Sequence, residues 1–274
     1  WESDNSKLSD LKKRVSPFIL RRTKSEVLRE LPEKVEKIIY CELNKEERVI
    51  YNDLLISGKD IINTLKKSNQ SQDNMEVLTL LLRLRQSCCD INLFTDKAGK
   101  NFVSSKLELL EPILLNAINQ GSKIIVFSQF VKMLNIIDQH LTSIGISSFL
   151  LHGGISSEKR NELVDKFQDP QNTVPVFLVS LKAGGYGLNL TAADTVVHFD
   201  PWWNPSVENQ ATDRIHRIGQ NKVVNCFKLI ASNTVEEKIL ILQKDKMNLI
   251  DMSIDEVRPV MSGLTKEDLS FVLK

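Results

Sequence analysis

Apolar and polar residues alternate along the second half of the chain in two periods that predict different elements. From residue 122 onward, short apolar runs predict buried strands, and the segments between them have the 3.6-residue spacing of amphipathic helices. Strands and helices that alternate in this way form a parallel sheet covered by helices, so we expect an α/β fold. The strands are expected over residues 123–127, 147–151, 176–180, 195–199 and 223–230, and helices over 131–144, 157–167 and 234–248.

The first half of the chain has a different pattern, because a helical block precedes the first fully apolar strand. Alternation over 35–43 predicts a half-buried strand, and the spacing then becomes helical over 44–66, 75–89 and 104–119. We interpret the block as a helical subdomain inserted in an α/β domain. The expected division is a basic linker or hinge (1–34), a first strand with a helical protrusion (35–120), an α/β lobe (121–248) and a helical tail (249–274). The basic linker suits either contact with nucleic-acid phosphates or a solvated connection.

Composition and charge exclude several classes of protein. Of the 274 residues, 42% are hydrophobic and 26% are charged, and the formal net charge is +1, which is ordinary for a globular domain. The sequence shows no signal peptide and no apolar run long enough to span a bilayer, so no membrane partner is expected. The chain starts with Trp1 rather than methionine, as expected for a fragment of a longer protein. The cysteines show no C-x-x-C spacing, which argues against a zinc site.

The segment from Pro205 to Gln220 predicts a helix with clear signals at both ends. Asn204 is a favourable N-cap residue, and Pro205 suits the first turn because its missing N–H would be unpaired there anyway. Gly219 is expected to end the helix.

One face of that helix would carry an amide and two guanidinium groups. Gln210, Arg214 and Arg217 stand at positions i, i+4 and i+7, so they are expected to point the same way. An arginine presents a fork of donors that matches phosphate oxygens, and such a face could stabilise a transferring phosphoryl group. The alternative is a solvated face on which Glu208 and Asp213 pair with the arginines.

Four loops follow predicted strands and are therefore expected at the carboxyl edge of the sheet, where open parallel sheets bind ligands. They begin at Ser128, His152, Ser180 and Asp200. Their glycine-rich backbone and their serine, lysine and glutamine side chains suit phosphate oxygens, although glycines also serve in tight turns without a ligand. In the second loop we expect a turn histidine that makes hydrogen bonds. We expect the two tryptophans of the fourth loop to wedge it against the core rather than to stack on bases.

The parts that usually hold a nucleoside triphosphate are missing from the sequence. No G-x-x-x-x-G-K-[ST] loop occurs in the chain, and no acidic Asp-Glu-x-His box follows a strand. Those parts cradle the phosphates and hold their magnesium ion. Arginines suited to phosphate, without such a cradle, imply that a partner domain supplies it.

Several stretches resemble the motifs of one family. Ser180 to Thr191, Asp200 to Pro205 and Gln210 to Gln220 resemble motifs five and six of the Swi/Snf-type ATPases, superfamily-two helicase relatives that translocate on duplex DNA. The resemblance continues in the same order at Phe18–Lys24, Lys123–Gln129, Leu151–Gly154 and Thr234–Lys238. It implies that residues 121–248 form the second, RecA-like helicase lobe, a parallel sheet flanked by helices, with the helical block as its protrusion.

The resemblance also implies roles for single residues. Arg214 and Arg217 would act as arginine fingers on ATP, which is bound with magnesium mainly by a missing N-terminal lobe. Gln210 would help to position them, and Gly187 and Asn189 would approach the nucleotide. The residues expected to track the DNA backbone are Ser128, Gln129, Gly153, Ser180 and Lys182.

The implied function is that of the C-terminal lobe of a DNA-dependent ATPase, inactive without its N-terminal lobe. Contacts to phosphates would make DNA binding largely independent of sequence and sensitive to salt. The expected partners are double-stranded DNA, the N-terminal RecA-like lobe and DNA-bound proteins, in the bacterial cytoplasm or nucleoid or in the eukaryotic nucleus. The alternatives are a non-catalytic DNA-binding or protein-docking module and an RNA-directed helicase lobe.

Overall fold

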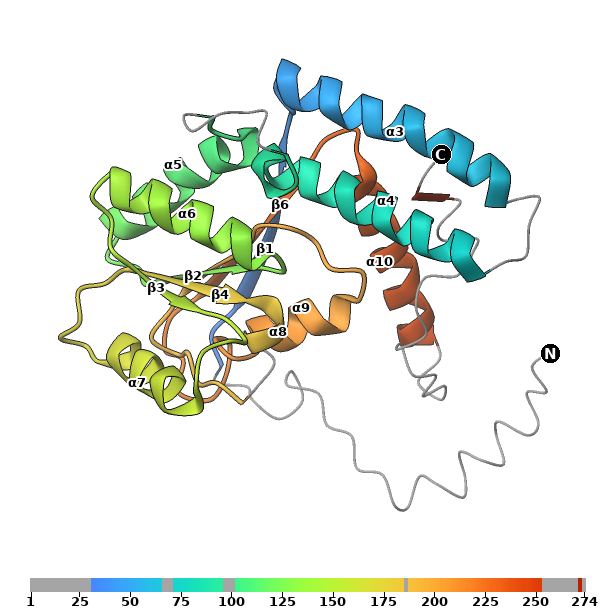
Figure 1. Ribbon diagram of the computed structural model, residues 1–274. Coiled ribbons are helices and arrows are strands. Elements are labelled where there is room, and N and C mark those ends of the chain that lie inside the picture. The colour runs from blue at the N-terminus through green and yellow to red at the C-terminus, as the bar shows by residue number, and fades with distance from the viewer. Residues whose placement is uncertain (1–30, 66–70, 96–101, 185–186, 253–270, 273–274) are drawn as a thin grey trace, which may run out of the picture.

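A single parallel sheet with helices on both faces organises the computed structural model, which describes residues 31–65, 71–95, 102–184, 187–252 and 271–272 (Figure 1). The strands are β1 (Lys34–Cys41), β2 (Ile124–Ser128), β3 (Ser148–Leu151), β4 (Val176–Ser180), β5 (Thr195–His198) and β6 (Val224–Ala231). The helices are α3 (Lys45–Leu65), α4 (Ser71–Cys89), α5 (Ser105–Asn119), α6 (Val131–Ser143), α7 (Ser157–Gln168), α8 (Leu181–Gly184), α9 (Pro205–Thr212) and α10 (Val235–Met252), with a short 3-10 helix η2 (Ile91–Leu93).

The strand order is β1-β6-β5-β2-β4-β3, and each pair of neighbours is parallel. The order changes direction at β2, because β4 lies on one side of it and β5 on the other. In doubly wound sheets, the carboxyl ends of the strands around such a switch point form the usual ligand site. The register brings the last residues of β2 and β4, Ser128 and Ser180, opposite each other at this point.

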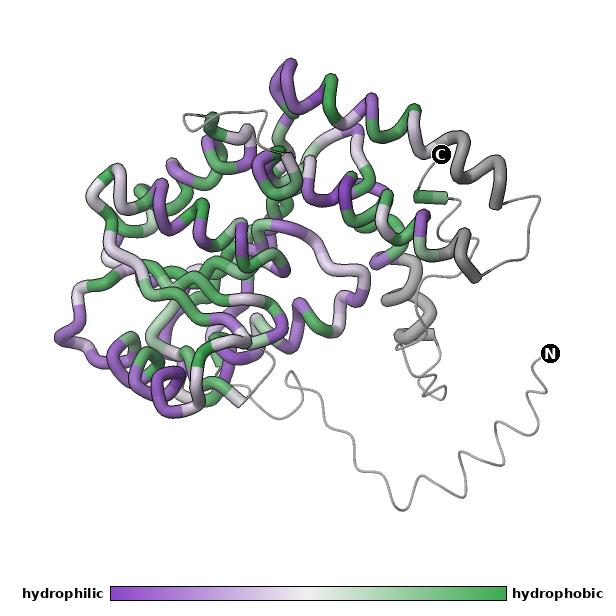
Figure 2. The backbone as a smooth tube through the Cα atoms, viewed as in Figure 1, coloured by the Kyte–Doolittle hydropathy of each residue, from purple (hydrophilic) through white to green (hydrophobic). Residues whose placement is uncertain are grey.

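Strand β2 is buried on both faces, which explains its unbroken apolar sequence. Ile124 and Val126 pack in a core cluster with residues of α5 and α6, whereas Ile125 and Phe127 pack in a second cluster with residues of α7 and α9. Side chains alternate across a strand, so one short run fills both layers. Figure 2 shows the central strands as hydrophobic along their length, while α6 and α7 carry hydrophilic residues as well.

A third core cluster lies between α3, α4 and α10 and joins the helical protrusion to the sheet. In Figure 1 the two protrusion helices lie beside α10, the helix that follows the last strand. Tyr51 of α3 is 2% exposed, and its hydroxyl accepts a hydrogen bond of 2.8 Å from the backbone N–H of Val235 in α10. The protrusion is therefore packed against elements from the opposite end of the described chain.

The predicted α/β fold is confirmed, and the observed strands lie within two residues of the predicted ones. Three helix limits were wrong, since α4 begins at Ser71 rather than Met75, α9 ends at Thr212 and α10 continues to Met252. Residues 1–30 of the expected linker and most of the tail from 249 lie outside the described residues, so the domain boundaries remain predictions. In the part of the chain that is described, no helix is both long and apolar enough to cross a membrane.

Candidate functional site

The carboxyl edge of the sheet carries the first group of predicted residues. Ser128 is 1% exposed, and its hydroxyl donates a hydrogen bond of 2.6 Å to Oδ1 of Asp200, the second residue after β5. The same carboxylate oxygen accepts the backbone N–H of Gln129 at 3.3 Å, and the Ser128 hydroxyl accepts the N–H of Phe130 at 3.1 Å. Ser128 therefore fixes the turn between β2 and α6, and Ser180, 4% exposed, is buried beside it in the register of the sheet.

Among the predicted residues at this edge that the structure describes, a lysine and a glycine reach solvent. Lys182 and Gly153 are exposed and Gln129 is half-buried. Lys182 lies in the single helical turn α8, so the predicted glycine-rich loop begins as a helix. His152 Nδ1 accepts the N–H of Gly154 at 3.1 Å, which confirms it as a turn residue. An exposed lysine and open backbone amides are the groups that bind nucleic-acid phosphates.

Gly184 shows why the chain needs a glycine at the end of α8. A methyl group at this position would come within 2.8 Å of Cε1 of the buried Phe127 ring. The backbone that leaves β4 can therefore pass over the sheet only without a side chain here.

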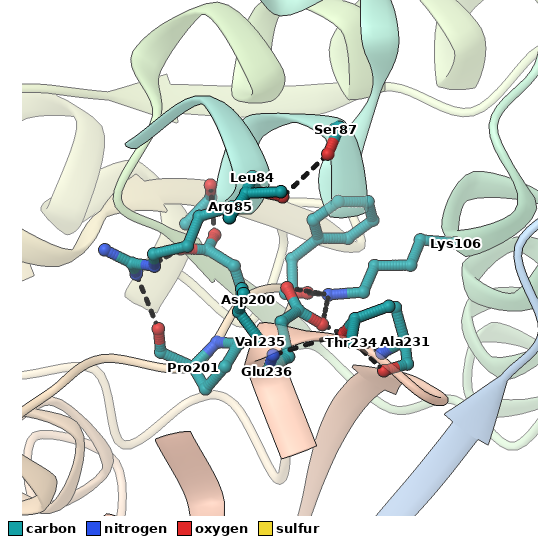
Figure 3. A network of polar contacts seen from close by, with 12 residues as sticks. Leu84, Arg85, Ser87, Lys106, Asp200, Pro201, Ala231, Thr234, Val235 and Glu236 are labelled. Carbon is teal, nitrogen blue, oxygen red and sulfur yellow. Dashed lines mark hydrogen bonds and ion pairs between the residues drawn. The ribbon is translucent and has the colours of Figure 1, made fainter. Parts of the chain in front are cut away.

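The loop after β5 is held by buried charges (Figure 3). Lys106 of α5 is fully buried, and its ammonium donates to the carbonyl of Phe199 at 2.8 Å and to Oε1 of Glu236 at 2.7 Å. Burial alone would lower the pKa of Lys106, but the Glu236 carboxylate raises it above its ordinary value, so the lysine stays charged. A buried charge persists only when it is paired and hydrogen-bonded in this way.

The same loop is held from its other side by α9 and α10. Glu208 is 1% exposed; its Oε1 accepts the backbone N–H of Trp202 at 2.6 Å and the amide of Gln243 at 2.9 Å. Its second oxygen lies 3.0 Å from the ammonium of Lys228 in β6. Glu208 is therefore a structural residue whose ion pair is with Lys228, and the predicted alternative, a face on which Asp213 and Glu208 pair with the arginines, stays a prediction. Trp202 and Trp203 pack against separate core clusters, which confirms that they wedge the loop.

The second group of predicted residues lies on the arginine segment, which we define as residues 213–220. The predicted helix was too long, because α9 ends at Thr212 and the segment consists of turns. The predicted start is confirmed, since the Asn204 side chain caps α9 and Pro205 is in its first turn. The carbonyl of Arg214 accepts the N–H of Leu190 at 3.0 Å. A continuing helix would need that carbonyl for the N–H four residues later.

Further contacts place the arginine segment at the amino end of the strands. The side-chain amide of Gln220 donates to the carbonyls of Ala193 at 2.7 Å and Thr191 at 3.1 Å, just before β5 begins. His216 Nε2 lies 2.7 Å from the carbonyl of Pro32, just before β1. The predicted site is thus divided between two regions, because the loops from Ser128 and Asp200 leave the opposite ends of the strands.

The polar groups of this second region face outward. Gln210 and Arg217 are exposed, and Arg214 is half-buried. The three side chains do not share a helix face as predicted, because both arginines follow the end of α9. Gly187 and Asn189 are also exposed, and the Arg214–Leu190 hydrogen bond joins the end of their loop to the arginine segment. An amide, a guanidinium and the backbone at two loop positions are therefore accessible to solvent.

His198, at the end of β5, is a buried residue that the sequence did not single out. Burial lowers its pKa to about 4, so the ring is neutral at neutral pH. Its Nε2 lies 2.9 Å from the hydroxyl of Thr212, the last residue of α9, and its ring stacks on Phe127 with 5.4 Å between the centroids. The described residues contain no group of His, Cys, Asp and Glu side chains that could hold a metal ion.

Two family models match the chain. The model described as helicase conserved C-terminal domain matches residues 105–219, and the model described as SNF2-related domain matches residues 2–93. An uncharacterized ATP-dependent helicase of Mycoplasma pneumoniae is 42% identical over 94% of this chain and 24% of its own length. A putative ATP-dependent helicase/translocase of Bacillus subtilis is 36% identical over 97% of this chain and 29% of its own length. The chain spans about a quarter of the length of these curated relatives.

Solved structures that resemble this chain are SWI2/SNF2 ATPases as well. The SWI2/SNF2 ATPase C-terminal domain of Sulfolobus solfataricus is 32% identical, with a TM-score of 0.68, over 88% of this chain and 98% of that chain. The SWI2/SNF2 ATPase core of the same organism, solved in complex with dsDNA, is 34% identical, with a TM-score of 0.71, over 96% of this chain and 55% of that chain.

Proposed function

Because this chain belongs to the SWI2/SNF2 family of ATP-dependent helicases and carries its C-terminal, RecA-like helicase lobe, we propose that it is half of a DNA-dependent ATPase that translocates on duplex DNA. The observation that carries the proposal is the division of the polar residues between two regions. The carboxyl edge offers phosphate-binding groups, the arginine segment offers the Arg217 guanidinium, and α9 offers the Gln210 amide.

The carboxyl edge is the proposed DNA surface. Lys182 and the exposed backbone at Gly153 contact phosphates, and the half-buried Gln129 extends the same surface. Ser128 and Ser180 are buried, so their proposed role is to hold the strand ends in register rather than to touch DNA through their side chains. Contacts of this kind position a protein on the duplex without reading its sequence.

The arginine segment is the proposed site of contact with ATP. Arg217, which is exposed, and Arg214 act as fingers that stabilise the charge on the transferring phosphoryl group, and Gln210 helps to position them. Gly187 has a φ of +48°, and a methyl group there would meet nothing within 4 Å, so its backbone is open to a ligand, as is that of Asn189.

The N-terminal lobe is the proposed partner that completes this site. The chain has no phosphate-binding loop of its own, so that lobe would hold ATP and its magnesium ion mainly by itself. ATP supplies the phosphoanhydride bond whose hydrolysis drives the cycle. Closure of the two lobes brings the arginine segment to the phosphates, and opening after hydrolysis moves the carboxyl edge along the DNA. DNA-bound proteins are further proposed partners of the complete motor.

The test is the ATPase rate of the full-length protein with and without duplex DNA, beside this chain alone. We expect DNA to stimulate the full-length protein, the chain alone to be silent, and Arg217→Ala to lower the full-length rate about 10³-fold. Arg83→Ala is the matched control, because Arg83 is an exposed arginine on α4, outside both regions. A full-length Arg217→Ala variant that keeps its rate would refute the finger assignment.

The same assay separates the two alternatives. Stimulation by RNA in place of duplex DNA would support an RNA-directed helicase lobe. A full-length protein that is silent with every nucleic acid would support a docking module.

A further inference from the structure

Arg85 of α4 is a buried cation that neither the motifs nor the proposed function accounts for. It is 4% exposed and lies in the helical protrusion, more than a hundred residues away in sequence from its partners. Its Nη2 atom donates to the carbonyl of Pro201 at 2.6 Å and lies 3.7 Å from Oδ2 of Asp200 (Figure 3). Both partners belong to the loop that follows β5.

Three aromatic rings surround the same guanidinium. Its central carbon lies 5.0 Å from the ring centre of Trp203, 5.5 Å from that of Trp202 and 5.9 Å from that of Phe130. The tryptophans come from the loop after β5, whereas Phe130 comes from the turn after β2. One arginine of the protrusion therefore contacts both turns that leave the centre of the carboxyl edge.

Asp200 joins these contacts to the edge itself. One carboxylate oxygen faces Arg85, and the other accepts the Ser128 hydroxyl and the Gln129 backbone N–H. Burial raises the pKa of Asp200, and the Arg85 guanidinium opposes that rise by stabilising the charged form. Two contacts, Arg85 to Asp200 and Asp200 to Gln129, therefore connect the protrusion to Gln129 through a buried carboxylate.

The Arg85–Asp200 contact has unused hydrogen-bonding capacity. Among the described residues, neither Asp200 Oδ2 nor Arg85 Nε has a hydrogen-bond partner, and the same is true of the side-chain nitrogen of Gln129. At 3.7 Å the two charged groups attract each other without a hydrogen bond. The guanidinium is therefore held by its hydrogen bond to Pro201 and by charge attraction to Asp200.

We propose that Arg85 is a positioning residue, which holds the Ser128–Gln129 turn through Asp200 in the geometry that binds the DNA backbone. The inference rests on the proposed function of the carboxyl edge. It gives the helical protrusion a role, since α4 supplies the cation that orders a DNA-contacting turn on the sheet.

The test is Arg85→Lys in the full-length protein. Lysine keeps the positive charge, but it cannot bind Pro201 and stack between the rings at the same time. We expect the duplex-DNA concentration that gives half-maximal ATPase stimulation to rise about tenfold, because a contact to a charged group is weakened by roughly 1.5 kcal/mol. The maximal rate should stay within about twofold of wild type.

Arg48→Lys is the matched control. Arg48 also reaches from the protrusion to backbone carbonyls, those of Ser232 at 2.9 Å and Asn233 at 3.1 Å, and its guanidinium also lies over an aromatic ring, that of Tyr51. It contacts the turn after β6, at the same edge of the sheet, but the contacts given for it do not include Ser128, Gln129 or Asp200. An Arg48→Lys variant with the same loss of DNA affinity would reduce Arg85 to a general stabilising role and overturn the inference.

Hydrogen exchange separates this inference from the proposed function. In Arg85→Lys, but not in Arg48→Lys, the peptide that covers residues 128–130 should exchange faster in the absence of DNA. Unchanged exchange, or a fall in the maximal rate with unchanged DNA affinity, overturns the positioning role. If the wild type shows no DNA-stimulated hydrolysis, the proposed function fails, and the exchange experiment alone decides the role of Arg85. If Arg85→Lys does not fold, Asp200→Asn takes its place in the same two measurements.

Discussion

Two stretches on either side of α9 are held in opposite ways. In residues 199–202, buried side chains from α4, α5, α9 and α10 bind the backbone and the Asp200 carboxylate. The arginine segment is fixed by its backbone at Arg214 and by the Gln220 side chain near its end, and between these points Arg217 and Ile218 are exposed, Ile218 to 72%.

The difference shows which part of the proposed machine the lobe completes alone. Burying five charged groups near residues 199–202 is costly unless each is paired, and the fold supplies the pairing itself; the five are Arg85, Lys106, Asp200, Glu208 and Glu236. The arginine segment is held by the backbone of Arg214 and by the side chains of His216 and Gln220, while Arg217 stays exposed. In the proposed function, the DNA edge is preorganised within the lobe, and the site for ATP is completed by the N-terminal lobe.

The largest expected effect is a loss of stability when a buried partner is removed from residues 199–202. Asp200→Ala leaves the Arg85 charge buried without its carboxylate and removes the acceptor of Ser128 and Gln129. We expect the free energy of unfolding of the chain in urea to fall by about 3 kcal/mol or more. Arg217→Ala, the matched change in the exposed stretch, should alter it by less than about 0.5 kcal/mol. Equal losses in the two variants would erase the contrast between the stretches.

The sheet could be predicted because the burial of a strand follows from residues that are neighbours in the sequence. The central strands β2 and β4 are short apolar runs, whose residues are buried on both faces in whichever sheet they join. The cap at Asn204 and the turn histidine His152 were predictable for the same reason, since their hydrogen bonds span two residues.

The parts of the site that depend on distant partners were not predictable in this way. The end of α9 is set by the carbonyl of Arg214, which bonds to Leu190 on another loop. Arg85 and Lys106 look like ordinary polar positions of amphipathic helices, and their partners lie 116 and 130 residues further along the chain. Ser128 was correctly placed at the edge, but its burial follows from Asp200, which the local pattern does not contain.

The second expected effect tests how well the carboxyl edge excludes water from the buried His198 ring. His198 is fully buried and faces Glu208 and Lys228, and its pKa of about 4 lies below the ordinary value of 6.5. The unfolded chain therefore binds a proton that the folded chain excludes, so stability is complete above pH 6.5 and is lost as the pH falls toward 4. We expect a loss of about 3 kcal/mol at pH 4.

The measurement for His198 is urea unfolding of the wild type and His198→Gln at pH 7 and pH 4. Other acidic groups titrate in both proteins, so the difference between the two pH profiles isolates the histidine. If the stability of the two proteins changed equally with pH, water would reach the His198 ring. The carboxyl edge would then be no better shielded from water than the arginine segment.

The smallest expected effects compare two glycines that lie three positions apart. Gly184→Ala, near the closed edge, brings a methyl group to 2.8 Å from the Phe127 ring and should cost about 2 kcal/mol through overpacking. Gly187→Ala, on the open side, meets nothing within 4 Å, and its φ of +48° should cost only about 1 kcal/mol. Thermal unfolding of the two variants compares the same chemical change at both positions. A larger loss of stability in Gly187→Ala would show that the loop at Gly187 is more tightly packed than the carboxyl edge.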